Sequence, residues 1–124
     1  MNKILISKAF IVNEGKVRVK DVLIKGKRIE KIENHISEPN VKETINAEGL
    51  YLFPGMIDDQ VHFREPGLTH KASISSESKA AIAGGVTSYI EMPNTIPQTT
   101  TIIEYDKKRL IASKNSAANY SFMF

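Results

Sequence analysis

The sequence contains no cysteine, which excludes disulfide bonds and any metal site built from thiolates. It also has no long hydrophobic run, since no stretch approaches the roughly 18 consecutive apolar residues that a membrane span requires. The N-terminal Met1-Asn2-Lys3 leads into alternating residues and not into the continuous apolar segment of a secretory signal. These absences predict a cytoplasmic protein that does not insert into a membrane.

A strong excess of charge is also missing, because the net charge of the 124 residues is only +3 at pH 7. The one dense basic cluster is Lys25-Gly26-Lys27-Arg28, and the acidic residues Glu30 and Glu33 follow it. Proteins that bind nucleic acids usually concentrate basic residues on one face or in one run. The cluster therefore predicts a solvated hairpin turn and no nucleic-acid partner.

The first fifty residues consist of short apolar runs separated by turn-forming residues. Turn chemistry is present at 13–16 and at Gly26, and a loop is expected at 37–40. The apolar runs lie at 4–12, 17–24, 29–36 and 41–47. This pattern predicts a small antiparallel β unit built from hairpins.

After Pro54-Gly55 the pattern changes to an alternation of strands and helices. Strands are predicted at 56–62, 86–92 and 120–124, and helices at 73–83 and 101–114. Gly84-Gly85 provides a helix end, and Thr101 with Glu104 provides a capping box. The order strand, helix, strand, helix, strand is typical of an α/β fold with a parallel sheet.

Three such strands leave an open sheet edge and a partly covered core. The whole chain is about half as long as a closed (β/α)₈ barrel, which needs roughly 250 residues. We therefore expect the chain to be the N-terminal part of a longer protein. The open edge also predicts self-association into a homo-oligomer.

Polar side chains follow the first two predicted parallel strands. His62 lies at the end of the first strand, Arg64 comes two residues later, and Asn94 follows the second strand. In parallel barrels the carboxyl ends of strands carry the catalytic residues. An imidazole there can bind zinc, and a guanidinium can bind a carboxylate in bidentate fashion. The alternatives are a hydrogen-bonded surface or core histidine, an asparagine that only caps a turn, and a solvated or salt-bridged Glu65.

Three segments together resemble the dihydroorotases, metal-dependent hydrolases of the amidohydrolase superfamily. They are Phe53-Pro-Gly-Met-Ile-Asp-Asp-Gln-Val-His-Phe-Arg-Glu-Pro-Gly67, Ala83-Gly-Gly-Val-Thr87 and Met92-Pro-Asn-Thr95. The resemblance implies that residues 53–124 form the first three strands of a (β/α)₈ TIM-like barrel. It also implies that residues 1–52 form an incomplete β-sandwich accessory domain.

The resemblance further implies a reaction, the reversible hydrolysis of the cyclic amide of dihydroorotate to N-carbamoyl-L-aspartate in pyrimidine biosynthesis. One or two zinc ions would be bound, with His62 as a ligand. Arg64 and Asn94 match the positions that hold the substrate carboxylate. The proton-shuttling Asp and the other metal ligands of the family are expected beyond residue 124. These 124 residues are therefore expected to contain no catalytic acid or base and to be inactive alone.

One position departs from the family pattern Asp-x-His-x-His. Asp58 and His62 keep their places, but Gln60 stands where the first histidine is expected. A glutamine amide oxygen is a poor substitute for imidazole at zinc. The alternatives are that Gln60 is a weak ligand, that Asp58 or Asp59 compensates, that one metal ion suffices, or that the site is inactive.

Two other functions remain as alternatives. The first is a non-catalytic dihydroorotase-like subunit that acts as a structural partner of aspartate carbamoyltransferase; Gln60 favours it, and Arg64 with Asn94 opposes it. The second is a related cyclic amidase, an allantoinase or a hydantoinase, which Arg64 opposes.

Overall fold

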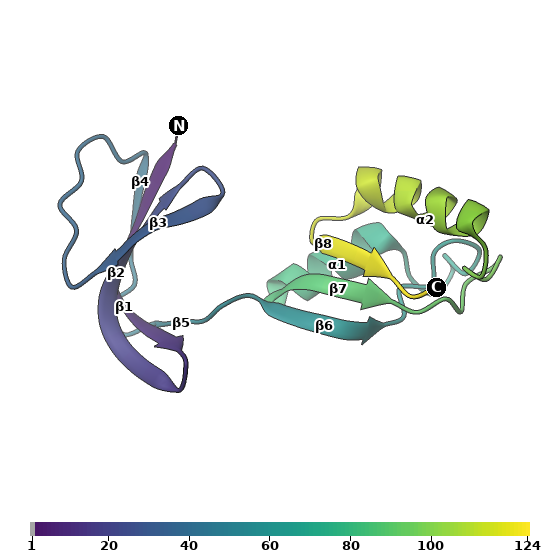
Figure 1. The fold of residues 1–124 in the computed structure, drawn as a ribbon, viewed down its shortest axis with the longest axis horizontal. Helices are drawn as coiled ribbons and strands as arrows, with labels where there is room; N and C mark the ends of the chain where they lie inside the picture. The colour runs from purple at the N-terminus through teal and green to yellow at the C-terminus, as the bar shows by residue number, and fades with distance from the viewer. Residues whose placement is uncertain (1) are drawn as a thin grey trace. The chain divides into compact units, whose positions relative to one another are not determined.

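The computed structural model describes residues 2–124, which divide into two compact units (Figure 1). The first unit ends at Pro54, and the second comprises Gly55–Phe124. The first unit is all β, and the second alternates strands and helices. The change in sequence pattern at Pro54-Gly55 therefore coincides with the change in architecture.

The first unit is a single five-stranded sheet in the order β3-β2-β1-β4, with β5 also paired to β1. Its strands are β1 (Lys3–Asn13), β2 (Lys16–Lys25), β3 (Arg28–Glu33), β4 (Glu43–Asn46) and β5 (Tyr51–Leu52). The predicted hairpins β1–β2 and β2–β3 are confirmed as antiparallel pairs. At the β2–β3 turn the solvated ion pair of Lys25 and Glu30 spans 3.1 Å.

The prediction of a purely antiparallel unit is wrong, because β4 and β5 both run parallel to β1. A parallel neighbour cannot follow from a tight hairpin and needs a longer connection. Residues 34–42 provide that connection and return the chain to the start of β1. β5 was not predicted as a strand, since two residues carry no detectable alternation.

A bulge in β1 between Ile6 and Ala9 is held by a carboxylate from β2. Lys8 adopts a φ of 58°, and its backbone N–H donates to Asp21 Oδ1 at 2.8 Å. The N–H of Ile36 donates to Asp21 Oδ2 at 2.9 Å. Burial acts to raise the pKa of Asp21, but these two donors outweigh it and the pKa lies below its ordinary value. Asp21 thus ties the bulge to the segment that follows β3.

We expect Asp21→Asn to destabilise the protein by about 2 kcal/mol at pH 7, because one buried N–H then faces an amide N–H and not a carboxylate oxygen. The lowered pKa means that the ionised Asp21 stabilises the fold above the ordinary carboxyl pKa and that this contribution is lost as pH falls. In urea unfolding of the intact protein, the difference in unfolding free energy between the parent and Asp21→Asn should therefore narrow below about pH 4. Glu14→Gln in the exposed β1–β2 turn is the control, and a pH-independent difference for Asp21→Asn would contradict the assignment.

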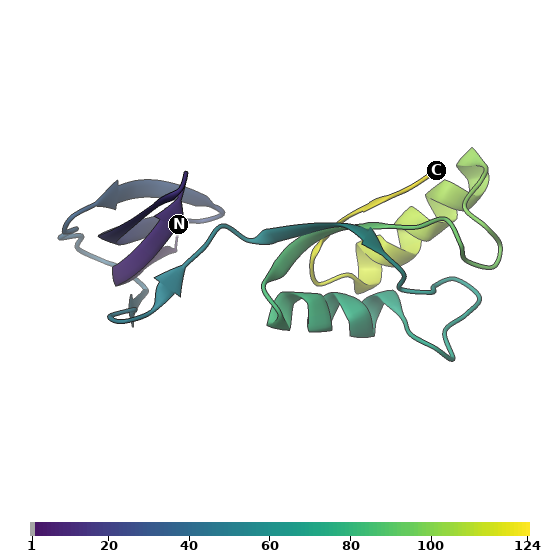
Figure 2. The same cartoon turned by 90° about the horizontal axis from the view of Figure 1, so that it is seen from below.

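The second unit is a parallel sheet in the order β6-β7-β8, which confirms the predicted α/β alternation. Its elements are β6 (Met56–Val61), α1 (Ile74–Ala83), β7 (Val86–Glu91), α2 (Ile102–Asn115) and β8 (Asn119–Phe122). Both helices lie on the same face of the sheet (Figure 2). The three strands therefore point their carboxyl ends toward one edge, as the sequence predicted. Among residues 2–124, no helix combines the length and apolar character that crossing a lipid bilayer demands.

The ends of the two helices are set by capping residues close in sequence. Ser73 caps α1 by accepting from the backbone N–H of Ser76 at 3.1 Å, and the chain leaves α1 through Gly84. Thr101 Oγ1 accepts from the N–H of Glu104 at 3.3 Å, as the predicted capping box requires. The Glu104 carboxylate instead pairs with Lys107, so only half of that box forms.

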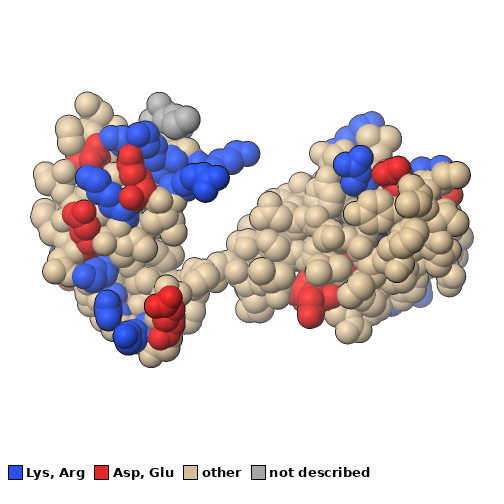
Figure 3. All heavy atoms as spheres, viewed as in Figure 1, with Lys and Arg blue, Asp and Glu red and all other residues tan. Residues whose placement is uncertain are grey.

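The core of the second unit lies between the sheet and the two helices. It comprises Phe63, Ile74, Tyr89, Ala112, Ala118 and Phe122. At its centre the rings of Phe63 and Tyr89 are 4.4 Å apart, and burial raises the pKa of Tyr89 to about 12. The opposite sheet face leaves Met56 58% and Ile57 69% exposed. In the view of Figure 3 the charged side chains of this unit lie mostly along its margins, and the middle of the visible face is uncharged.

Candidate functional site

Two loops extend from the carboxyl ends of β6 and β7 and are joined to each other. The N–H of Met92 donates to the Val61 carbonyl at 3.0 Å, which continues the strand pairing. Further out, the N–H of Ile96 donates to the Pro66 carbonyl at 3.1 Å. The predicted residues His62, Arg64 and Asn94 therefore lie on one connected structure at the edge where such sites occur in parallel sheets.

The structure brings together His62 and Asn94, which are 32 residues apart in the chain. His62 Nδ1 lies 3.1 Å from Asn94 Oδ1. An amide oxygen can only accept, so the His62 ring donates from Nδ1, and in the neutral ring Nε2 then carries the lone pair. This is the tautomer that a metal ligand needs, with the ring oriented by its second nitrogen. Among residues 2–124 the amide N–H groups of Asn94 have no hydrogen-bond acceptor, so they can donate to an anion.

Arg64 follows β6 in a left-handed backbone conformation with φ of 71°. Its backbone N–H donates to Glu91 Oε1, the acceptor at the end of β7, at 3.0 Å. Its side chain is half-buried, and within the described residues 2–124 the guanidinium has no ion-pair partner. The backbone is thus fixed while the charged group stays available for an anionic ligand.

The close approach of the two loops depends on Gly67. Its φ is 85°, and a Cβ atom at this position would lie 2.0 Å from the backbone oxygen of Ile96. Real Cβ atoms do not come this close to backbone atoms, and the left-handed conformation itself favours glycine. The Pro66-Gly67 pair of the sequence therefore serves loop-to-loop packing as well as a turn.

Glu65 has a structural role that the sequence did not predict. Its Oε2 accepts from the backbone N–H of Ile74 at 2.8 Å, at the first turn of α1. A carboxylate here satisfies one of the unpaired helix N–H groups and interacts favourably with the helix dipole. Glu65 thus ties the loop after β6 to the helix that follows it.

A buried ion pair beneath the loops was missed in the sequence. Glu91 Oε2 and Lys108 Nζ are 3.1 Å apart, and neither side chain is exposed. Lys108 Nζ also donates to the Met92 carbonyl at 3.1 Å and lies 5.0 Å from the centre of the Phe122 ring. Burial raises the pKa of Glu91 and lowers that of Lys108, and each partner's charge opposes the shift. A detectable signal was the glutamate that directly follows Tyr89 and Ile90 at the end of a predicted strand.

The predicted metal ligands are arranged along one strand end. Asp58 Oδ1 accepts from the backbone N–H of Gln60 at 3.1 Å inside a bulge of β6, and the Gln60 side chain is exposed. Within residues 2–124, no three His, Asp or Glu side chains are grouped to hold a metal ion. The free Nε2 of His62 fits a metal as one ligand of a set. A complete site needs about three protein ligands, so further donors would have to come from outside these residues.

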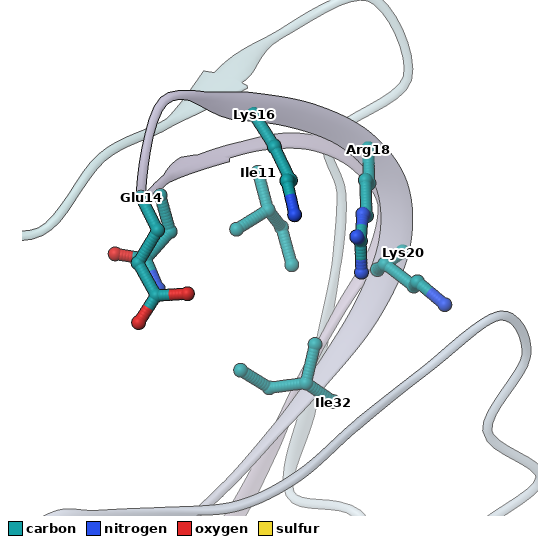
Figure 4. A pocket seen from close by; sticks show the side chains of 7 residues that line it. Ile11, Glu14, Lys16, Arg18, Lys20 and Ile32 are labelled. Carbon is teal, nitrogen blue, oxygen red and sulfur yellow. The ribbon is translucent and has the colours of Figure 1, made fainter.

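A hollow of about 240 Å³ on the first unit does not belong to this site. Figure 4 shows the basic side chains Lys16, Arg18 and Lys20 around the apolar Ile11 and Ile32. All of its lining residues come from β1, β2, their turn and β3. None of the residues predicted for substrate or metal binding lines it.

The fold of the chain is similar to that of solved structures of one class. The L-hydantoinase (dihydropyrimidinase) from Arthrobacter aurescens matches 98% of this chain with a TM-score of 0.92 and 27% identity. The D-hydantoinase (dihydropyrimidinase) from Thermus sp. matches 98% with a TM-score of 0.83 and 31% identity. The matches cover 27% of each of those chains. The architecture is therefore that of the amidohydrolases that act on cyclic amides.

The particular family follows from the sequence. A family model described as "Dihydro-orotase-like" matches residues 49–119, and the chain belongs to that family. The dihydroorotase of Carboxydothermus hydrogenoformans is 46% identical over 114 residues, which are 90% of this chain and 26% of the relative. That of Wolbachia sp. subsp. Drosophila simulans is 41% identical over 123 residues, 97% of this chain and 28% of the relative. The chain thus spans about a quarter of the length of the curated relatives it matches.

Proposed function

We propose that the intact protein containing this chain is a dihydroorotase, which reversibly hydrolyses the cyclic amide of dihydroorotate to N-carbamoyl-L-aspartate. Its curated relatives are named dihydroorotases, and we assign Arg64 and Asn94 to the carboxylate of such a substrate. The reaction adds water across the ring amide: the C–N bond breaks, the nitrogen takes up one proton of the water, and the carbonyl carbon becomes a carboxylic acid that releases its proton to solvent as it ionises.

The observation that carries the proposal is the contact of Asn94 with His62, together with the position of Arg64 two residues after His62 in the loop that follows β6. The Arg64 guanidinium offers planar paired donors, and the Asn94 amide offers N–H donors held by the contact of its Oδ1 with His62. Dihydroorotate bears a ring carboxylate that matches this donor set. A cyclic amide without a carboxylate would leave Arg64 without a ligand, which is why the hydantoinase alternative is disfavoured despite the similar fold.

His62 would contribute its Nε2 to a metal ion such as zinc, together with ligands from outside residues 2–124. The metal supplies polarisation of the amide carbonyl and lowers the pKa of water toward neutrality. Asn94 holds the His62 ring in the ligating tautomer, and Arg64 orients the substrate by its carboxylate. We assign no acid or base for the proton transfer to a residue of this chain.

We further propose that residues 53–124 are the first three strands of a (β/α)₈ barrel and that residues 1–52 are part of a β-sandwich domain. The uncovered sheet face with Met56 and Ile57 supports the first assignment, because the inner face of a barrel is filled by its other strands. The exposed Val17, Val19 and Ile29 of the first unit support the second. These faces and the open sheet edges also favour self-association.

The test is turnover of dihydroorotate by the intact, zinc-supplied protein and its Arg64→Met variant. We expect the parent to hydrolyse dihydroorotate. Arg64→Met should lower kcat/KM about 100-fold, since a charge-assisted bidentate contact is worth roughly 3 kcal/mol. Arg109→Met on the exposed face of α2 is the control and should leave kcat/KM unchanged.

A folded, metal-loaded parent without turnover would overturn the proposal. That outcome would favour the second candidate, a non-catalytic subunit that supports aspartate carbamoyltransferase, for which Gln60 in place of a histidine is the favouring observation. Equal activity of the parent and Arg64→Met would instead indicate a cyclic amidase that does not read a substrate carboxylate.

A further inference from the structure

The ion pair of Glu91 and Lys108 takes no part in the proposed chemistry, yet it is fully buried at the end of the sheet that carries the site. Removing two charges from water is costly, and their attraction regains this cost only with good geometry and further hydrogen bonds. An apolar pair of the same volume would fill the place at least as well. The pair therefore calls for a role other than packing.

The further contacts of the pair indicate that role, because each partner holds the backbone of one site loop. Glu91 Oε1 accepts from the N–H of Arg64 at 3.0 Å. Lys108 Nζ donates to the carbonyl of Met92, two residues before Asn94, at 3.1 Å. The two loops are thus connected beneath the surface through one charged contact.

The hydrogen bond between the Arg64 N–H and Glu91 holds a residue whose backbone conformation is strained. A non-glycine residue with φ of 71° is unfavourable by about 1–3 kcal/mol and persists only when its surroundings hold it. The charge-assisted bond from the Arg64 N–H to Glu91 provides such a hold. Release of this bond would let the backbone relax and change the direction in which the guanidinium leaves the loop.

We propose that the Glu91–Lys108 ion pair is a positioning element that sets the spacing of Arg64 and Asn94 and thereby favours substrates with a ring carboxylate. The proposal rests on the proposed function, since it assigns these two residues to carboxylate binding. Neither Glu91 nor Lys108 touches the substrate; both act through the loop backbone.

The experiment compares Glu91→Gln and the double variant E91Q/K108M with the parent, all as intact metal-loaded protein. KM and kcat are measured for dihydroorotate, and Ki is measured for dihydrouracil, the same ring without the carboxylate. Misplacement of the carboxylate contacts should raise KM for dihydroorotate roughly tenfold, with kcat and the Ki of dihydrouracil nearly unchanged. The double variant leaves no single charge buried, so it keeps the test available if E91Q fails to fold.

A matched control is available on the same helix. Lys107 forms an exposed ion pair with Glu104 at 2.9 Å, next in sequence to Lys108. Lys107→Met should change neither KM nor Ki, because exposed pairs of this kind contribute little.

The outcomes separate the two proposals. A parent without dihydroorotate turnover overturns the proposed function and this inference with it. A parent with turnover, whose E91Q and E91Q/K108M variants keep the parent KM, overturns the positioning role alone. The same holds when KM for dihydroorotate and Ki for dihydrouracil rise by equal factors, since that result marks a general structural role.

Discussion

His62→Ala in the intact protein is expected to lower both bound metal and activity. The ring is exposed, its Nδ1 is fixed by Asn94 Oδ1 at 3.1 Å, and Nε2 is free for a ligand. A bound metal ion stabilises the charge of the transition state by several kcal/mol, and loss of one ligand weakens that effect. The kcat/KM for dihydroorotate should therefore fall on the order of 1000-fold. Because the side chain is exposed, the melting temperature of the metal-free protein should stay close to that of the parent.

Metal content measured by elemental analysis provides a readout that does not depend on activity. His70→Ala is the matched control, since His70 is another exposed histidine in the same loop. It should keep the metal content and kcat/KM of the parent. A His62→Ala protein with the full metal content of the parent would show that His62 is not a ligand.

Gly67→Ala is expected to have the largest effect on stability. The added Cβ would meet the Ile96 backbone oxygen at 2.0 Å, and φ of 85° is unfavourable for alanine. Backbone strain of about 1–3 kcal/mol and overpacking of similar size give a loss of roughly 4 kcal/mol. The loops that carry Arg64 and Asn94 would separate, so KM for dihydroorotate should rise as well.

Gly85→Ala separates these two causes. Gly85 has φ of 89°, and a Cβ there would meet nothing within 4 Å. It therefore reports the conformational penalty alone, which we expect to be about 1 kcal/mol with an unchanged KM. Urea unfolding of the parent and both variants measures the loss of unfolding free energy that each substitution causes. Equal losses for Gly67→Ala and Gly85→Ala would show that the loops do not depend on the close approach.

Much of the second unit was predictable because its signals are local. The apolar runs around Ile57 and Ile90 indicated strands, and Ser73, Thr101 and Gly84 marked helix boundaries through short-range hydrogen bonding. Such signals act within a few residues and do not depend on the rest of the fold. The strand–helix alternation then favoured a parallel sheet, which places polar residues that follow the strands at one edge.

In the first unit, local sequence signals predicted the hairpins but not all of the strand pairing. The hairpins β1–β2 and β2–β3 follow from turn residues, but the parallel pairing of β4 and β5 with β1 does not. Which strand a segment pairs with after a long connection depends on the edge that is open when the chain returns. No feature of residues 43–46 specifies that edge.

The sequence by itself determined the α/β alternation, the positions of His62, Arg64 and Asn94 after their strands, and the resemblance that the family match confirms. Only the tertiary structure decided the contact of His62 with Asn94, the approach of Gly67 to Ile96 and the burial of Glu91 with Lys108. The physical reason is distance along the chain. Each of these contacts joins residues that are far apart in sequence, and their geometry exists only after the loops and α2 have packed on the sheet.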